Sequence, residues 1–329
     1  MGMRIIRSQQ QFSDVESGGV LTIGNFDGVH AGHQEILKAA RQMAVQRETS
    51  LILMTFEPHP VAILHPEKAP KVLTGLEWKL HLLSQFADVG VVLADSKALL
   101  DLTAERFADR FLMQTIRPSV IVEGEDFKFG ADRGGSIETL KGLGSRMGFE
   151  VKVIPSKHIK LPTGQVLRVS STMIRYMLQA GQVADAALAL GRPFRLYGKV
   201  VPGRGKGRQI GFPTLNMERP DQVLPAEGVY AGWVQRADSC QGLFSEKDRL
   251  PAVFSLGQAR TFGDDHPLLI EAHVLSGPVG DGAGQWMAID FVEHLRPQHK
   301  FSTVEDLVGQ IARDCQHAKA VLGQVDRPL

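Results

Sequence analysis

The segment VLTIGNFDGVHAGHQ, residues 20–34, decides the fold of the first half of this chain. Three apolar residues and one threonine open it, as is typical of a buried strand, and an amphipathic helical pattern follows over residues 34–46. Three glycines and two histidines lie between these two patterns. In an open parallel sheet, ligands bind at such strand-to-helix turns, so the segment predicts both a fold and a site.

The same alternation continues outward from this segment. Apolar runs at 51–56, 89–93, 120–122 and 151–154 are separated by helical patterns at 76–86, 104–113 and 137–147. Two shorter helical patterns, 172–180 and 183–190, follow. Strands that alternate with helices predict an α/β domain whose parallel sheet has helices on both faces.

The second half of the chain has a different pattern. Short strand-like runs are separated by turns rich in Gly, Pro and Asp, and they lie at 195–201, 229–234, 250–255, 268–275 and 286–294. This pattern predicts a small antiparallel β-barrel. Because Gly191 stops a helix just before Pro193, we predict two domains, residues 1–191 and 192–329.

One helix is predicted at the C-terminal end. Ser302 and Glu305 are expected to form its capping box. Its predicted apolar stripe consists of Val304, Leu307, Val308, Ile311, Cys315, Ala318 and Leu322. Cys315 lies on that stripe, so we expect it in the core.

Composition excludes several function classes. The chain has 329 residues, with 37 Lys and Arg against 36 Asp and Glu, and this balance argues against a basic nucleic-acid binder. Its 2 cysteines cannot form a disulfide framework. The first ten residues lack the apolar core of a secretory signal, and no run of about 18 apolar residues predicts a membrane span. We therefore expect a cytoplasmic enzyme of small molecules, with no nucleic-acid or membrane partner.

The turn at residues 24–33 has the chemistry of a phosphate site. Gly28 and Gly32 let backbone N–H groups approach an anion, and the helix N-terminus behind them adds a favourable dipole. His30 and His33 lie three residues apart, so both can face the same phosphates and balance charge on a leaving group. The alternative to a phosphate site is a tight strand-to-helix turn in which the two histidines have no role in binding.

This run matches the HxGH signature of the nucleotidyltransferases. Its extended form, G-x-F-D-G-x-H-x-G-H, resembles the adenylyltransferase module of the bifunctional bacterial riboflavin kinase/FAD synthetase family. The resemblance implies a Rossmann-like domain that joins FMN to ATP and releases pyrophosphate. It implies catalytic roles for His30 and His33. It also implies ATP or phosphate binding by Gly24, Phe26, Asp27, Gly28 and Gly32.

Three further segments support the resemblance: TFEPHP at 55–60, VEGEDFKFG at 122–130 and RVSSTMIR at 168–175. Each is expected at the carboxyl end of a strand or the start of a helix. The resemblance makes Ser171, Thr172 and Arg175 candidate phosphate ligands, although Arg175 could be a solvated surface residue. The candidates for the flavin end of the substrate or a magnesium ion are Glu57, Asp126 and Arg168. For Glu57, an ordinary loop carboxylate is the alternative.

A second group of residues lies in GRGKGRQIGFPTLN, residues 203–216. No acidic residue occurs between positions 186 and 217, whereas the basic residues there are Arg192, Arg195, Lys199, Arg204, Lys206 and Arg208. Alternating glycine and basic residues suit a phosphate-binding loop, with a solvated hairpin as the alternative. Thr214 and Asn216 lie two apart on an extended chain, so their oxygens share one face and suit Mg²⁺ bound with nucleotide phosphates.

This segment resembles the flavokinase signature G-R-x-x-G-F-P-T-x-N. The resemblance implies a small barrel that uses ATP to phosphorylate riboflavin, with Thr214 and Asn216 on the metal. It implies a role for Glu271 as proton acceptor, and strand alternation places Glu271 and His273 on one face. The phosphate-binding residues that it implies are Gly203, Lys206, Gly207, Arg208, Gly211 and Pro213.

One departure from the family pattern leaves an alternative open. The D-L-Y-G segment expected after the Glu271 strand is missing, and residues 276–284 stand in its place. Our main hypothesis is an enzyme that makes FMN and then FAD from riboflavin and ATP, with possible weak self-association. The alternatives are an FMN adenylyltransferase with a weakened or lost kinase, and a flavin- or nucleotide-binding regulator without turnover. A generic nucleotidyltransferase would not explain residues 207–216.

Overall fold

The structure is a computed structural model, and it describes residues 3–7, 15–93, 97–244, 249–257, 268–277 and 280–324. Two compact units make up the chain. The first unit contains Met1–Lys71 and Trp78–Val169, and the second contains Val72–Glu77 and Ser170–Leu329. The domain boundary at 191/192 stays a prediction.

A six-stranded parallel sheet forms the centre of the first unit, with strand order β1-β4-β3-β2-β5-β6. Its strands are β1 (Arg4–Ile6), β2 (Val20–Ile23), β3 (Leu51–Phe56), β4 (Val89–Leu93), β5 (Val120–Gly124) and β6 (Glu150–Ile154). The parallel sheet and its five predicted strands are confirmed. Strand β1 was not predicted, because three residues are too few to show a repeating pattern of apolar side chains. A separate hairpin follows the sheet, β7 (His158–Lys160) and β8 (Val166–Arg168).

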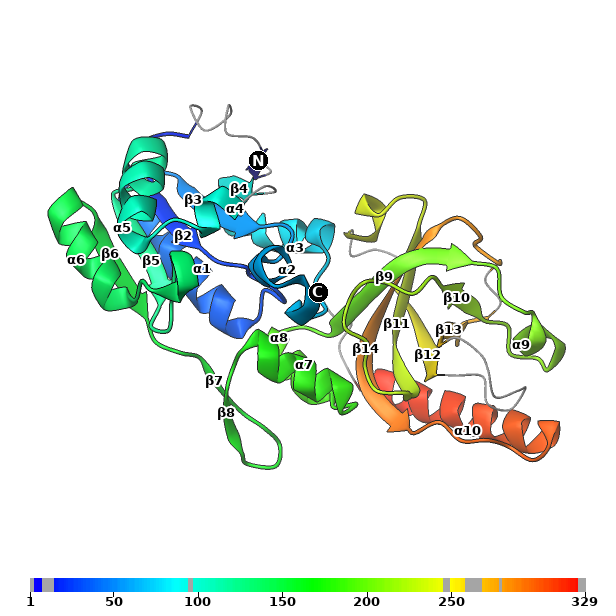
Figure 1. Cartoon of the computed structure of the whole chain (residues 1–329). Coiled ribbons are helices and arrows are strands. Elements are labelled where there is room, and N and C mark those ends of the chain that lie inside the picture. The colour runs from blue at the N-terminus through cyan, green and yellow to red at the C-terminus, as the bar shows by residue number, and fades with distance from the viewer. Residues whose placement is uncertain are drawn as a thin grey trace. The chain divides into compact units, whose positions relative to one another are not determined.

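Helices lie on both faces of this sheet, as predicted (Figure 1). Helix α1 contacts β2, β3, β5 and β6, whereas the segment after residue 104 and helix α6 belong to a core cluster with Leu21, Ile52 and Ile121. The helices are α1 (Ala31–Gln46), α2 (Pro60–Leu64), η2 (Pro66–Lys68), α3 (Leu76–Leu83), α4 (Lys97–Leu100), α5 (Ala104–Arg106), η3 (Phe107–Ile116), η4 (Ala131–Arg133) and α6 (Ile137–Met147).

The prediction of one α-helix over 104–113 was wrong in its geometry. Thr103 caps a short α5, and the chain then winds as a π-helix through η3. The buried residues of η3 are Phe107, Ala108, Phe111, Leu112 and Ile116. Their spacings of four and five residues fit a wider turn than the α-helix has, so the π-helix keeps all five against the core.

The order of the strands places the first predicted site. The chain runs from β2 to β3 on one side of the sheet and later returns to place β5 on the other side of β2. The carboxyl ends of β2 and β5 therefore form the point where the strand order reverses. This is where an open α/β sheet offers a crevice, and residues 24–33 directly follow β2.

A closed antiparallel barrel forms the second unit, as predicted, with strand order β10-β13-β12-β11-β14-β9. Its strands are β9 (Phe194–Val201), β10 (Leu215–Met217), β11 (Gly228–Ala237), β12 (Leu250–Gly257), β13 (Leu269–Val274) and β14 (Trp286–Arg296). The helices of this unit are α7 (Ser171–Gln179), α8 (Val183–Leu190), α9 (Lys206–Gln209), η5 (Gln241–Phe244) and α10 (Val304–Leu322). The three-residue strand β10 was not predicted as a strand, although residues 214–216 were expected to be extended.

Helix α10 packs against β11, β12 and β14 (Figure 1). Its C-terminal half belongs to a core cluster in which Cys315 and Ala318 meet Val229 and Trp233, so the expected burial of Cys315 is confirmed. The predicted cap was wrong by one residue, because the hydroxyl of Thr303 accepts from the Asp306 N–H at 3.1 Å.

The predicted apolar stripe of α10 was also wrong at its start, since Val304 is 48% exposed. The buried residues of this helix begin only at Asp314. Its N-terminal half faces a cavity instead of the barrel core, as described below. None of the helices among the described residues is both long and apolar enough to cross a membrane.

Candidate active sites

His30 and His33 are held together at the start of α1. The Nδ1 atom of His30 accepts from the backbone N–H of His33 at 3.2 Å, so His30 is itself the N-cap of this helix. The two imidazole rings are stacked, with centroids 3.6 Å apart and planes 15° apart. The predicted pair of histidines is therefore a preformed stack at a helix N-terminus, where anions are favoured.

The turn before α1 has an unusual backbone. Phe26, Gly28 and Val29 have positive φ angles of 48°, 87° and 39°. Glycine adopts such angles freely, but a β-branched residue such as Val29 does so only under constraint from its surroundings. Part of that constraint is visible, since the Thr55 hydroxyl donates to the carbonyl of Asn25 at 3.1 Å. Strain of this kind is typical of binding loops.

The other predicted residues of the turn support the histidines. The ring of Phe26 is buried and lies edge-on to His33, with centroids 5.3 Å apart. A Cβ at Gly24 would come within 3.1 Å of that ring, and a Cβ at Gly32 would come within 3.3 Å of the His30 ring. Asp27 is also buried. The glycines therefore provide the space in which the aromatic rings pack.

Glu123 is a residue of this site that the sequence analysis missed. It is the second-last residue of β5, is 3% exposed, and its carboxylate accepts from the Ile23 N–H at 2.6 Å. Burial, with a further contribution from nearby Asp126, raises the pKa of Glu123 well above its usual value. Its carboxyl group thus holds the end of β2, the strand that leads into the histidine turn. The feature of the sequence that could have identified Glu123 is a single acidic residue directly after the apolar run 120–122.

The two predicted carboxylates of this site each have a cationic partner. Glu57 accepts from the buried ammonium of Lys79 at 3.3 Å, and Lys79 also donates to the Phe56 carbonyl at 3.1 Å. Asp126 is paired with Arg168, so the structure brings these two predicted residues together. A carboxylate that is already paired with a cation is a poor candidate for a metal ligand. The two ion pairs therefore argue against a Mg²⁺ ion held by Glu57 or Asp126.

A side-chain contact links two of the motifs. The side-chain amide of Asn25 lies 3.0 Å from Nε2 of His59. Nδ1 of His59 accepts from the Val61 N–H at 3.1 Å and caps α2, so Nε2 carries the proton in the neutral ring. The atom of Asn25 that faces this nitrogen is Nδ2, so a half-turn of the amide group is needed to present its oxygen as the acceptor. The sequence analysis did not connect these positions because 34 residues separate them.

The third predicted motif lies in the second unit. Ser171, Thr172 and Arg175 are on α7, and Thr172 is exposed. The helix cap is the preceding Ser170, whose hydroxyl accepts from the Met173 N–H at 3.2 Å. The hydroxyl groups of Ser171 and Thr172 are therefore not needed to cap this helix.

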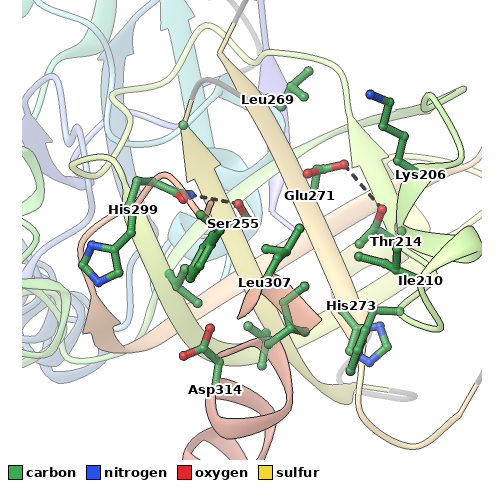
Figure 2. Close-up of a pocket in the computed structure, with 18 of the residues that line it drawn as sticks. Lys206, Ile210, Thr214, Ser255, Leu269, Glu271, His273, His299, Leu307 and Asp314 are labelled. Carbon is green, nitrogen blue, oxygen red and sulfur yellow. Dashed lines mark hydrogen bonds between the residues drawn. The ribbon is translucent and has the colours of Figure 1, made fainter. Parts of the chain in front are cut away.

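A cavity of about 190 Å³ lies beside the barrel in the second unit (Figure 2). Its walls are the glycine-rich loop, the outer faces of the strands, residues 296–301 and the N-terminal half of α10. The lining residues are Arg204, Gly205, Lys206, Gly207, Ile210, Phe212, Thr214, Val229, Val253, Ser255, Gly257, Leu269, Glu271, His273, Arg296, Gln298, His299, Phe301, Leu307, Ile311 and Asp314.

Glu271 lies in the wall of this cavity, where the sequence placed it. In the register of the barrel it is opposite Asn216 on β10 and opposite Ser255 on β12, and such partners share a face of the sheet. The hydroxyl of Thr214 donates to Oε1 of Glu271 at 3.4 Å, as Figure 2 shows. Burial raises the pKa of Glu271, and Arg204 and Thr214 partly offset this shift. The carboxylate of Glu271 is thus a stronger base than a glutamate carboxylate that is exposed to water.

The glycine-rich loop folds tightly onto this acid. A Cβ at Gly203 would come within 2.2 Å of the Asn216 amide, and one at Gly207 would come within 2.4 Å of the Phe212 carbonyl. Lys206 lines the cavity, whereas Arg208 is exposed and does not line it. Gly203, Gly211 and Pro213 are also not among the residues that line the cavity.

One basic residue that we assigned to the phosphate region has another role. Arg195 is buried inside the second unit and forms a two-pronged ion pair with Asp290, with both N–O distances 2.7 Å. A guanidinium held in this way cannot reach a ligand. The absence of acids near Arg195 in the sequence was misleading, because Asp290 comes from a distant strand.

The far wall of the cavity was missed by the sequence analysis. Arg296 donates to both oxygens of Asp314 on α10, at 2.8 to 3.1 Å, and Gln298 donates to the Ser255 hydroxyl at 2.9 Å. The apolar stripe predicted for α10 indicated only that this helix packs against the core. Leu307 and Ile311 supply apolar surface beside these polar groups. An amphipathic pattern does not distinguish a helix that covers a core from one that covers a ligand cavity.

No cluster of three or more His, Cys, Asp or Glu suited to a metal ion occurs among the residues that the structure describes. The side-chain oxygen atoms of Thr214 and Asn216 are a different kind of set, since a nucleotide would complete it with phosphate oxygens. The two units thus present two phosphate-type sites. One is a histidine turn on a parallel sheet, and the other is an acid beside a glycine-rich loop on a barrel.

These two sites define a class of two-module transferases that act on nucleotide phosphates. The sequence model of the FAD synthetase family matches residues 13–172, and that of the riboflavin kinase family matches residues 190–322. The bifunctional riboflavin kinase/FMN adenylyltransferase of Escherichia coli K12 is 35% identical over 98% of this chain and 98% of its own length. That of Haemophilus influenzae is 35% identical over 97% of this chain and 99% of its own. The chain belongs to the bifunctional riboflavin kinase/FMN adenylyltransferase family.

A solved structure shares the fold over almost the whole length. The crystal structure of a macrolide-efflux protein from Streptococcus pneumoniae is 28% identical, with a TM-score of 0.80, and it covers 96% of this chain and 99% of that one. This similarity concerns the fold. The word efflux describes the Streptococcus pneumoniae protein and is not applied to this chain.

Proposed function

We propose that this enzyme catalyses two successive transfers from ATP. In the first, riboflavin and ATP give FMN and ADP. In the second, FMN and ATP give FAD and pyrophosphate. The observation that carries the proposal is that each family match covers its own candidate site, the histidine turn in residues 13–172 and the Thr214–Glu271 pair in residues 190–322.

In the kinase reaction, Glu271 accepts the proton of the ribityl hydroxyl as that oxygen attacks the γ-phosphorus of ATP. Its buried position raises its pKa and makes it a better proton acceptor. The apolar walls of the cavity, among them Leu307 and Ile311, receive the flavin ring. Lys206 and Arg204 lie at the loop side of the cavity and balance the charge of the phosphates.

Thr214 and Asn216 fit a magnesium ion that arrives with ATP. Mg²⁺ prefers oxygen ligands and often takes only one or two from the protein together with substrate phosphates. The Asn216 amide is held where a side chain at Gly203 would otherwise lie. When bound, Mg²⁺ would neutralise charge that develops on the phosphate oxygens.

In the adenylyl transfer, the phosphate of FMN is already ionised at neutral pH and attacks the α-phosphorus of ATP directly. The site must align the two substrates and balance the charge of the departing pyrophosphate. The His30–His33 stack at the start of α1 provides this balance, and Ser171, Thr172 and Arg175 are candidates for further phosphate contacts. Asp126, Arg168 and Glu57 are candidates for the flavin end of FMN.

The missing D-L-Y-G segment does not favour a lost kinase. The match to the riboflavin kinase family extends over residues 190–322, a range that includes residues 276–284. We also propose a cytoplasmic location, which fits the two buried free thiols Cys240 and Cys315. Weak self-association, which the family resemblance implied, stays a prediction.

The test is an assay of purified protein with riboflavin, ATP and Mg²⁺, and separately with FMN, ATP and Mg²⁺. We expect FMN and FAD from the first mixture and FAD from the second. If neither product forms, the proposed function is wrong.

Two variants test the assignment of sites. The double variant His30→Ala, His33→Ala should form FMN but no FAD. Glu271→Gln should form FAD from FMN but almost no FMN from riboflavin. Loss of FAD formation from FMN in Glu271→Gln would contradict the assignment of one reaction to each site.

A further inference from the structure

We propose that His273 is a positioning residue of the kinase site, and that it fixes the peptide that carries Thr214. The ring nitrogen Nδ1 of His273 lies 2.8 Å from the carbonyl oxygen of Pro213. This inference rests on the proposed kinase function, because its effect is expected on MgATP. His273 itself is not assigned a contact with either substrate.

The position of His273 follows from the alternation of β13. Glu271 and His273 are two residues apart, so their side chains share the face that lines the cavity, while Ile270, Ala272 and Val274 are buried on the other face. Figure 2 shows both side chains on this strand, next to Thr214. His273 and Glu271, which project from the same face of β13, thus hold the adjacent residues Pro213 and Thr214.

Side-chain bonds replace the strand ladder at this point. The pairing of β10 with β13 begins at Leu215, which is opposite Ala272, and continues to Asn216, which is opposite Glu271. Pro213 has no N–H to donate to a ladder. The His273–Pro213 bond and the Thr214–Glu271 bond therefore anchor a stretch of chain that β13 does not hold through its backbone.

The chemistry fixes which ring nitrogen carries the proton. The carbonyl of Pro213 can only accept, so Nδ1 of His273 must donate, and in the neutral ring Nε2 is then unprotonated. The ring of Phe212 meets the His273 ring edge-on, with centroids 5.3 Å apart and planes 70° apart. The imidazole is thus fixed by one polar and one aromatic contact from adjacent residues.

The Pro213 carbonyl belongs to the peptide group that leads into Thr214. If this peptide rotates, the Thr214 hydroxyl moves relative to Glu271. Their hydrogen bond is already long, at 3.4 Å, so a small further movement would break it. Since Thr214 is a proposed metal ligand, loss of the His273 bond should weaken the use of MgATP more than the binding of riboflavin.

The kinetic test compares His273→Leu with His273→Asn. The leucine variant lacks the donor, whereas an asparagine amide can place an N–H close to the position of Nδ1. In riboflavin kinase assays we expect His273→Leu to raise the apparent KM for MgATP and lower kcat, on the order of tenfold each, with the KM for riboflavin within about twofold. His273→Asn should recover most of the loss. The exposed His317 on α10 provides the control, and His317→Leu should match the unmodified protein.

Two further readouts keep the test independent of folding and of the proposed function. Formation of FAD from FMN by the same variants reports whether the chain is folded. The ¹⁵N shifts of His273, assigned by their absence in His273→Asn, should show the Nδ1–H tautomer in the unmodified full-length protein, and this needs no turnover.

The Nε2–H tautomer would overturn the proposal, as would unchanged MgATP kinetics in His273→Leu or equal losses in the leucine and asparagine variants. A protein that shows the Nδ1–H tautomer but never forms FMN would refute the proposed kinase function and leave the contact itself intact.

Discussion

At the scale of single residues, Glu123 is the buried acid that holds the strand before the histidine turn. Strands β2 and β5 pair through Leu21 and Ile121. Two residues further along, the Glu123 carboxyl accepts from the Ile23 N–H at 2.6 Å. A buried acid with one backbone donor is most stable in its protonated form, because burial penalises the charge.

We predict that Glu123→Gln removes a pH dependence of stability. Burial raises the pKa of Glu123 in the folded protein above its ordinary value of 4.5, so the folded state binds more protons and the free energy of unfolding falls as the pH rises above 4.5. Glu123→Gln should therefore gain stability relative to the unmodified protein by about 1.4 kcal/mol per pH unit in this range, until the folded-state pKa is passed. Urea unfolding between pH 4 and pH 8 measures the difference.

The control for this prediction is Glu123→Leu. Leucine removes the acceptor for the Ile23 N–H, so Glu123→Leu should be less stable than Glu123→Gln by about 1 to 3 kcal/mol at every pH, without restoring the pH dependence. A slope that persists in Glu123→Gln would show that another group causes it.

Local spacing was enough to single out His30, His33 and Thr214 as candidates, because each lies in a short run of chemically informative residues, whereas Glu271 became a candidate only through the family resemblance. Glu123, Lys79 and Asp314 were not predictable in this way. Their partners lie in other elements, at Ile23, Glu57 and Arg296. Only the fold brings such pairs together. The same reason explains why Arg195 looked like a phosphate residue although Asp290 holds it.

At the scale of elements, the glycine-rich loop shows how close packing positions a site. Gly207 lies in the short helix α9 of this loop, and its carbonyl accepts from the Phe212 N–H at 2.8 Å. Its own Cα faces the Phe212 carbonyl, where a Cβ would come within 2.4 Å. The segment that carries Thr214 therefore returns directly over Gly207, and a side chain there must displace it.

We predict that Gly207→Ala lowers kcat/KM of riboflavin kinase by on the order of 10²-fold, since displacement of a catalytic group by about 1 Å has an effect of this size. Formation of FAD from FMN should be unchanged. The measurement is steady-state kinetics of both reactions on the same preparation.

Gly309→Ala on α10 is the matched control for Gly207→Ala. A Cβ at Gly309 would meet only the Arg313 side chain, at 3.7 Å, so this change should preserve both activities. Equal kinase rates in the two variants would contradict the role assigned to the loop.

Helix α10 shows the limit of pattern analysis for an element. Its period correctly predicted a helix and the burial of Cys315 and Ala318. The period could not show that Leu307 in the first turns borders a cavity of about 190 Å³, that Ile311 borders both this cavity and the core, and that Cys315 and Ala318 in later turns belong to the core. Both environments select apolar side chains at the same spacing.

At the scale of the whole molecule, helices α7 and α8 are built into the barrel unit. Helix α8 contacts β9 and β14, and its buried residues include Val183, Ala186 and Leu190. The backbone N–H of Ala226 donates to the carbonyl of Leu178 on α7 at 2.9 Å. The candidate phosphate ligands Ser171, Thr172 and Arg175 are therefore held by the unit that also contains the kinase site.

This arrangement predicts that the two reactions cannot be separated by a cut at the domain boundary that the sequence suggests. A fragment of residues 1–191 keeps α7 and α8 but loses the strands that bury Val183, Ala186 and Leu190. The exposed apolar face should bind a hydrophobic dye, and the fragment should lose most of its FMN adenylyltransferase activity. Addition of the fragment 192–329 should restore that activity and reduce dye binding, because the helices can dock again on β9 and β14. A fragment 1–191 that is monomeric, binds no dye and keeps full activity would show that α7 and α8 need no barrel to be stable.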